Sequence, residues 1–317
     1  MKVVLIGKGI MLSAMIRGCL NTYNVDIAGV LRYENITENR LWLWIKDFFR
    51  HCSEKTLIKR NNLRELHFKS VNSAGFRKFL IKNSVDAVIV GTWREKISEE
   101  TFSIPPLGFI NIHPSLLPKY RGPNPYLQVI KNREKFSGFT FHLIDENFDT
   151  GKILFKKQLE IPRFYTAKEL RETTVFAVEK SLPEFLKQYE DGKIKPVKQN
   201  VRGASYFPNI TRDDMMLDFK KETALEIIAR IKALHPWLPC YVTAGNDFYI
   251  PNPYKLKIEK SSKVTFSLDD KKKIIRAKCK DGRTVVMRDV RKYSKFFGLF
   301  ITQIQKLFLW FGIVRHY

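Results

Sequence analysis

Asn111 and His113 stand two residues apart in the segment GFINIHPSLLP, whose first part has the composition of a buried strand. Side chains two residues apart on a strand point to the same face, so the amide and the imidazole are expected to face one site. Two such groups can donate hydrogen bonds to the oxyanion that forms when a nucleophile attacks a carbonyl carbon. The pair therefore predicts acyl-transfer chemistry.

Asp149 is the third candidate for this site. It lies in the segment NFDTG, in a loop after a second strand-like segment, SGFTFHLI. A carboxylate at this point can raise the pKa of His113 and relay protons. Taken alone, the trio also fits a structural histidine and an ordinary Asp-Thr-Gly turn. Its residue types suggest catalysis without establishing it.

Metal chemistry is not indicated by the sequence. No Cys-x-x-Cys pair occurs among the four widely separated cysteines, Cys19, Cys52, Cys240 and Cys279. Ligand spacing is also absent among the histidines outside the trio, which are His51, His67, His142, His235 and His316. We therefore predict neither a zinc site nor a disulfide framework, and a reducing cytoplasm is the expected compartment.

The elements that must position the trio follow an α/β pattern. Short β-rich segments alternate with helical ones in the first half, which predicts a doubly wound, mainly parallel sheet. The predicted strands are residues 2–6, DIAGVLR, DAVIVGTW, GFINIH and SGFTFHLI, and the predicted helices are IMLSAMIRGCL, AGFRKFLIKN and residues 167–189.

With 317 residues, the chain fits two domains better than one. We predict a first domain at residues 1–192 and a polar linker containing proline and glycine at 193–209. Residues 210–317 then form the C-terminal part. It has a helix near 221–234, followed by short β-like segments that predict a small OB-like barrel.

The formal net charge is +24, and cations concentrate between Lys271 and Lys292. Such a stretch suits an anionic partner: nucleic acid, an anionic membrane surface or a phosphorylated substrate. A generally basic surface is the other explanation.

The first residues, MKVVLIGKG, are interpreted as a strand and not as a signal peptide. No segment approaches the roughly 20 apolar residues that span a bilayer.

Two motifs resemble those of the folate-dependent formyltransferases: NIHPSLLPKYRGPNP and GFTFHLIDENFDTGKIL. The resemblance implies a Rossmann-like catalytic domain in which the catalytic residues are Asn111, His113 and Asp149. It also implies 10-formyltetrahydrofolate as co-substrate. The folate-binding residues that it implies are Val90, Gly91, Thr92 and Trp93, then Ser115, Leu116, Leu117 and Pro118, then Asp145, Asn147 and Phe148. Arg121 matches a motif arginine on the substrate side.

The resemblance continues in ASYFPNITRDDMMLDF and IARIKALHPWLPCYV, which look like the linker and C-terminal helix of the methionyl-tRNA formyltransferases. It stops in residues 33–70 and after about Ser294. The arginine- and glycine-rich loop expected after the second strand is absent. In its place stands NRLWLWIKDFFRHCSEKTLIKR, which predicts either a locally packed helix or a surface that stacks on a nucleic acid end.

Three functions remain open on the sequence. The first is formylation of the amino group of initiator methionyl-tRNA, with tRNA as partner. The second is N-formylation of a nucleotide-linked amino sugar. In that case the basic C-terminal part would contact a diphosphate or an anionic surface, and the apolar tail KFFGLFITQIQKLFLWFGIVRHY would be either an interfacial or a docked helix. The third is a catalytically silent module that binds RNA or protein.

Overall fold

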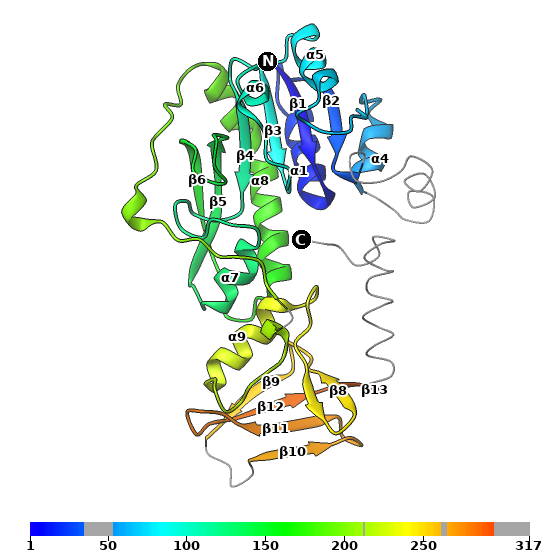
Figure 1. Cartoon of the computed structure of the whole chain (residues 1–317), viewed down its shortest axis with the longest axis vertical. Helices are drawn as coiled ribbons and strands as arrows, with labels where there is room; N and C mark the ends of the chain where they lie inside the picture. Colours follow the sequence, from blue (N-terminus) through cyan, green and yellow to red (C-terminus); the bar gives the residue numbers. More distant parts are fainter. Residues whose placement is uncertain (35–52, 212, 261–264, 295–317) are drawn as a thin grey trace. The chain divides into compact units, whose positions relative to one another are not determined.

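The computed structural model describes residues 1–34, 53–211, 213–260 and 265–294 (Figure 1). It divides into two units. Unit 1 comprises residues 1–122, 137–159 and 172–206, and unit 2 comprises residues 123–136, 160–171 and those from 207 onward. The predicted boundaries at 192 and 209 stay predictions. Most of the aromatic segment after residue 34 and the whole apolar tail lie outside the described residues.

Within its described residues, unit 1 has a six-stranded sheet in the order β2-β1-β3-β4-β5-β6. Strands β1 to β4 are parallel, and β5 runs antiparallel to β4. This confirms the predicted α/β domain with a mainly parallel sheet. The strands are β1 (Lys2–Gly7), β2 (Asp26–Arg32), β3 (Ala87–Gly91), β4 (Phe109–His113), β5 (Phe136–Leu143) and β6 (Ile153–Glu160).

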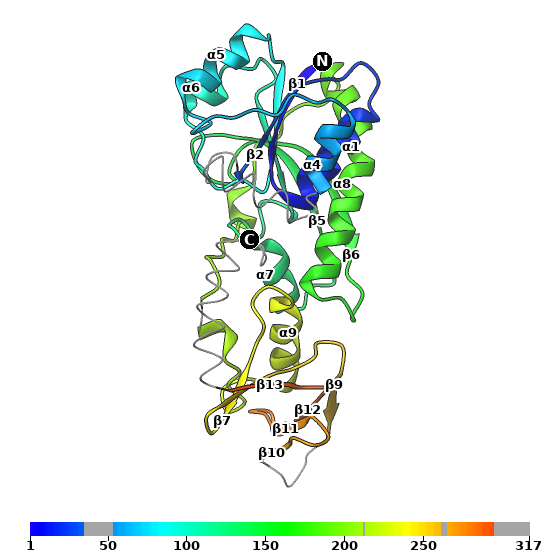
Figure 2. The ribbon, with the colours of Figure 1, turned by 90° about the vertical axis from the view of Figure 1, so that its right-hand side faces the viewer.

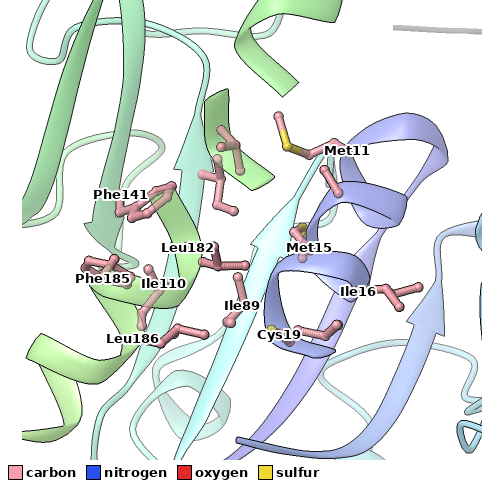
Figure 3. Packing of buried hydrophobic residues seen from close by; sticks show 14 of the residues in the cluster. Met11, Met15, Ile16, Cys19, Ile89, Ile110, Phe141, Leu182, Phe185 and Leu186 are labelled. Atoms are coloured by element: carbon pink, nitrogen blue, oxygen red, sulfur yellow. The ribbon is translucent and has the colours of Figure 1, made fainter. Parts of the chain in front are cut away.

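Helices α1 (Gly9–Leu20), α4 (Ser53–Arg60) and α8 (Ala167–Glu190) cover one face of this sheet (Figure 2). Met15 of α1 and Leu182 of α8 are fully buried against strand residues such as Ile89 (Figure 3). A cluster of this kind stabilises the fold by removing apolar surface from water, at about 25 cal/mol per Å². The two long helices thus fix the sheet on which the candidate site is built.

Helices α5 (Ala74–Lys82) and α6 (Glu99–Phe102) lie on the opposite face (Figure 2). Helix α5 begins at Ser73, whose hydroxyl accepts a hydrogen bond from the backbone of Phe76 in the usual manner of an N-cap. Phe76 and Val90 belong to the cluster that fills this face. Because β4 contributes Phe109 to the same cluster, its residues 111 and 113 point the same way.

Unit 2 carries two antiparallel sheets within its described residues, of four strands (β10-β11-β12-β9) and three strands (β13-β8-β7). Helix α9 (Ala224–Leu234) begins at a capping box formed by Thr223 and Glu226, and it packs on α7 (Pro125–Lys131). Closure into an OB-like barrel stays a prediction. The strands are β7 (Val242–Ala244), β8 (Asp247–Ile250), β9 (Leu256–Glu259), β10 (Phe266–Asp269), β11 (Ile274–Lys278), β12 (Thr284–Arg288) and β13 (Arg291–Ser294).

Candidate active site

The candidate site forms where the apolar face of the sheet changes to polar residues at the end of β4. The cluster residue Phe109 is followed on the same face by Asn111 and then His113. Asn111 pairs in register with Val90 of β3 on one side and with His142 of β5 on the other. Residues paired across neighbouring strands share a face. Strands β4 and β5 therefore bring their polar side chains to one place, beside the apolar Val90 of β3.

His113 is held at both ring nitrogens. Its Nδ1 lies 3.2 Å from Asp149 Oδ1, and its Nε2 lies 2.8 Å from the backbone oxygen of Tyr120. The other carboxylate oxygen of Asp149 accepts a hydrogen bond of 2.9 Å from the backbone of Gly122. The structure therefore brings two members of the predicted trio into direct contact, and the segment 120–122 supports both.

The charges of this pair reinforce each other. Burial favours the neutral form of His113, but the charge of Asp149 and the hydrogen bond to it outweigh that effect and raise the pKa of His113 above its usual value. Burial also opposes ionisation of Asp149. The contact with His113 and the Gly122 hydrogen bond overcome this opposition and lower the pKa of Asp149 well below its usual range. The pair favours an imidazolium beside a carboxylate.

His142 is a site residue that sequence reasoning missed. The amide of Asn111 donates to its Nε2 over 3.0 Å, and its Nδ1 donates to the backbone oxygen of Leu143 over 2.8 Å. Burial, opposed in part by Asp149 and assisted by His113, lowers the pKa of His142 to about 4. The ring is therefore neutral near pH 7 and orients the Asn111 amide. Only the pairing of β4 with β5 reveals this role.

The loop that carries Asp149 is held in an uncommon shape. Asp149 has a φ of 59°, in the left-handed region that most residues avoid. The carboxylate of Asp145 accepts hydrogen bonds from the hydroxyl of Thr150 and the backbone of Asn147, at 2.6 and 3.2 Å. Gly151 approaches the chain so closely that a Cβ there would collide with the backbone oxygen of Leu143. Each contact helps to place the Asp149 carboxylate on His113.

The segment from Ser115 to Pro118 is fixed beside the same strands. Thr140, which pairs with His113, donates its hydroxyl to the backbone oxygen of Ser115 at 2.7 Å and accepts from the backbone of Leu117 at 3.1 Å. The Ser115 hydroxyl donates to the backbone oxygen of Lys119 at 2.7 Å. One buried threonine thus binds the turn after β4 at two points.

The other predicted residues lie at the end of β3, in the turn after β4 and in the loop after β5. Val90 and Gly91 are the last two residues of β3. Glycine at position 91 lets α1 pack closely on the strand, since a Cβ there would come within 2.6 Å of Met15 Sδ. Thr92 has a φ of 59°, and Trp93 packs edge-on against Tyr33. Leu116 packs on Gly138, and Leu117 is fully buried. Asn147 and Phe148 are exposed.

Arg121, predicted on the substrate side, is bound within the chain. Its guanidinium donates to the side-chain oxygen of Gln199, with Nη2 at 2.6 Å and Nε at 3.3 Å.

Among the residues that the structure describes, no group of three or more His, Cys, Asp or Glu side chains could hold a metal ion. The site brings together an amide, two imidazoles and a carboxylate, with a guanidinium nearby.

A family model described as formyl transferase matches residues 1–186, the part of the chain that contains Asn111, His113 and Asp149. The chain belongs to the formyl transferase family. In this chain, the two motifs quoted from the sequence lie at the site just described, one at the end of β4 and the other in β5 and the loop that follows it. Among the residues that the structure describes, no helix is long and apolar enough to cross a membrane.

Curated relatives include two proteins named methionyl-tRNA formyltransferase. The protein from Thermotoga maritima is 32% identical over 53% of this chain and 54% of its own length. The protein from Caldanaerobacter subterraneus subsp. tengcongensis is 35% identical over 59% of this chain and 60% of its own length. The chain thus spans little more than half the length of these relatives.

Solved structures extend the similarity of fold over more of the chain. WlaRD, a sugar 3N-formyl transferase, has a TM-score of 0.66 at 20% identity and covers 91% of this chain and 97% of its own. An N-formyltransferase from Helicobacter canadensis has a TM-score of 0.66 at 18% identity and covers 92% of this chain and 100% of its own. At this identity, the likeness concerns the fold alone.

Proposed function

We propose that this chain transfers a formyl group from 10-formyltetrahydrofolate to a primary amine. The observation that carries the proposal is the buried contact of 3.2 Å between His113 and Asp149, with the Asn111 amide oriented beside it. An amine that attacks the formyl carbon creates a tetrahedral intermediate with a negative oxygen. Asn111 has a second amide hydrogen to donate to that oxygen, and the imidazolium of His113 stabilises its charge.

Proton movement falls to the His113–Asp149 pair. The new bond joins the amine nitrogen to the formyl carbon, and the bond from that carbon to N10 of the folate breaks. The amine loses one proton and the departing N10 gains one, so the reaction needs no net acid or base. Asp149 keeps His113 in its charged form and passes the proton between the two nitrogens, through water.

The residues at the ends of β3 and β5 suit the folate co-substrate. A pterin ring offers alternating donors and acceptors, which backbone groups of Val90 to Trp93 and of the Asp145–Phe148 loop can match. The side chain of Phe148 is 58% exposed, so its ring is available to an apolar ligand. The ring nitrogen of Trp93 is buried with no hydrogen-bond partner among the described residues, which is a further polar group near the end of β3.

For the acceptor, we propose the amino group of methionyl-tRNA first. The support is the identity of 30–35% with relatives named methionyl-tRNA formyltransferase. Unit 2 adds exposed cations. Lys257 of β9 and Lys278 of β11 are exposed, whereas Arg276 of β11 is partly buried. Lys257 and Arg276 flank Val286 of β12 on one face of the four-stranded sheet, and Lys278 lies two residues beyond Arg276 on that face. Such a face gains affinity for a phosphate backbone by releasing counterions.

A nucleotide-linked amino sugar is the second candidate acceptor. The observation that favours it is coverage: the two N-formyltransferase structures described above match 91% and 92% of this chain in fold, whereas the first two relatives above match 53% and 59% of it in sequence. The missing arginine- and glycine-rich loop after β2 points the same way. The exposed cations of unit 2 would then contact a diphosphate or an anionic surface.

A transfer assay tests both acceptors. The whole chain is supplied with 10-formyltetrahydrofolate and, in separate reactions, with charged initiator methionyl-tRNA or a panel of nucleotide-linked amino sugars. Formylation of the tRNA supports the first acceptor, and its rate should fall steeply with salt. Formylation of a sugar alone supports the second. Failure with every acceptor, together with failure to bind folate in calorimetry, would overturn the proposed transfer.

A further inference from the structure

Gln199 lies in an irregular segment after α8, yet only 6% of its surface is exposed. The segment is anchored on both sides of this residue. Val197 and Ile153 exchange backbone hydrogen bonds of 2.8 Å, and the backbone oxygen of Ser205 accepts from Arg121, also at 2.8 Å. A polar side chain that is buried in a loop needs partners for all of its hydrogen-bonding groups, and Gln199 has them.

The amide nitrogen of Gln199 holds the loop that carries Asp149. It donates to the backbone oxygens of Asp149 and Gly151, at 2.9 and 2.8 Å. The left-handed conformation of Asp149 is unfavourable for a residue with a side chain, so the loop needs contacts that favour this shape. Gln199 supplies two of them with one NH2 group.

The amide oxygen of Gln199 holds Arg121, whose Nη2 and Nε both donate to it. The two sequence neighbours of Arg121 bind the proposed catalytic pair directly. Tyr120 offers its backbone oxygen to His113, and Gly122 donates its backbone N–H to Asp149. One planar amide therefore ties together the two segments that support His113 and Asp149.

We propose that Gln199 is a positioning residue that sets the geometry of the His113–Asp149 pair, through the Asp149–Gly151 turn on one side and Arg121 on the other. The inference rests on the proposed formyl transfer. The role requires both halves of the amide. Glutamate keeps an oxygen for Arg121 but cannot donate to the two backbone oxygens, and methionine lacks both functions at a similar length.

The test uses Gln199→Glu and Gln199→Met in the whole chain. Matched controls are Gln188→Glu and Gln188→Met, since the Gln188 side chain makes an exposed hydrogen bond to Glu184 on α8. Formyl transfer and thermal unfolding are measured for each. We expect kcat to fall by roughly tenfold to a hundredfold in both Gln199 variants with little change in KM for folate, because small displacements of catalytic groups cost this much. The Gln188 variants should match the wild type.

An NMR titration of His113 distinguishes positioning from a merely structural role. The charged groups facing His113 are Asp149, Arg121 and, when protonated, His142. Arg121 lowers the pKa of His113. A glutamate beside Arg121 offsets that charge, so Gln199→Glu should titrate His113 at higher pH than Gln199→Met. Folded Gln199 variants with wild-type kcat and a wild-type His113 titration would overturn the inference. If the wild type transfers no formyl group, the proposed function fails, and the titration still decides the role of Gln199.

Discussion

The imidazole of His113 and the carboxylate of Asp149 meet at 3.2 Å, with side chains that are only 5% and 12% exposed. Strand β4 supplies one partner and the loop after β5 supplies the other. A buried ion pair gains from Coulomb attraction only when its remaining hydrogen-bonding groups are also satisfied. Tyr120 and Gly122 meet this condition, one on each partner. The arrangement makes the protonation state of His113 depend on Asp149.

Asp149→Asn should lower the pKa of His113. Burial and Arg121 both lower this pKa, and in the variant they are opposed only by the hydrogen bond to Tyr120, because the attraction of Asp149 is gone. A smaller fraction of His113 is then charged at pH 7, and kcat/KM for formyl transfer should fall by roughly 10²–10⁴-fold. An NMR pH titration of the His113 Cε1–H measures the shift. Asp86→Asn is the control, since that carboxylate accepts a hydrogen bond from the backbone of Lys2. An unchanged His113 titration in Asp149→Asn would contradict the electrostatic account.

Asn111→Ala should reduce kcat by about 10²–10³-fold, because one preorganised donor to an oxyanion is worth about 3–4 kcal/mol of barrier. KM for the folate should change little, since the hydrogen bond forms fully only in the transition state. Steady-state transfer kinetics measure both constants. Asn61→Ala serves as the control, because Asn61 makes an exposed hydrogen bond at the end of α4. A near-normal kcat for Asn111→Ala would remove Asn111 from the mechanism.

Much of unit 1 is predictable from the sequence because strands such as β1 and β3 are buried on both faces. The segment DIAGVLR corresponds to β2, and AGFRKFLIK corresponds to α5. Strand β6 escapes prediction, since its middle residues Lys156 and Lys157 are exposed and its apolar residues do not alternate cleanly. Edge strands of this kind owe their position to pairing, which local pattern does not encode.

The site divides in the same way. The common orientation of Asn111 and His113 can be predicted from the sequence, because residues two apart on a strand point to the same face. His142 requires the register between β4 and β5, and Gln199 requires the path of an irregular segment that returns to the sheet. Neither contact leaves a periodic signal, because each joins residues that are distant along the chain.

Thr140→Val should destabilise the turn after β4. Thr140 is fully buried, and the substitution leaves the backbone oxygen of Ser115 and the backbone N–H of Leu117 without this partner. The expected loss is about 1–3 kcal/mol in the free energy of unfolding, measured by urea denaturation. If the turn binds folate, KM for the folate should rise as well. Thr22→Val should cost less, since the Thr22 hydroxyl only donates to the backbone oxygen of Gly18. Equal losses would argue against a special role for Thr140.

His142 should make the fold sensitive to mild acid. Its pKa is about 4 in the folded chain, against a usual value of 6.5. As pH falls below 6.5, His142 becomes protonated in the unfolded chain but stays neutral in the folded chain. The free energy of unfolding therefore decreases until pH reaches about 4. The full shift corresponds to about 3 kcal/mol. His113 acts with the opposite sign, since its raised pKa stabilises the fold below its usual value and this contribution disappears as pH rises through the folded-state value.

His142→Gln separates these two effects, because glutamine can still hydrogen-bond to Asn111 and does not titrate. Urea denaturation at pH 7.5 and at pH 4.5 gives the free energy of unfolding of each protein. Between these two values the wild type should lose about 2–3 kcal/mol more than His142→Gln does. At pH 7.5 the variant should differ from the wild type only by the change in packing and hydrogen bonding. Equal pH dependence in the two proteins would mean that His142 is protonated in the folded chain, and Asn111 would then lack the acceptor that orients it.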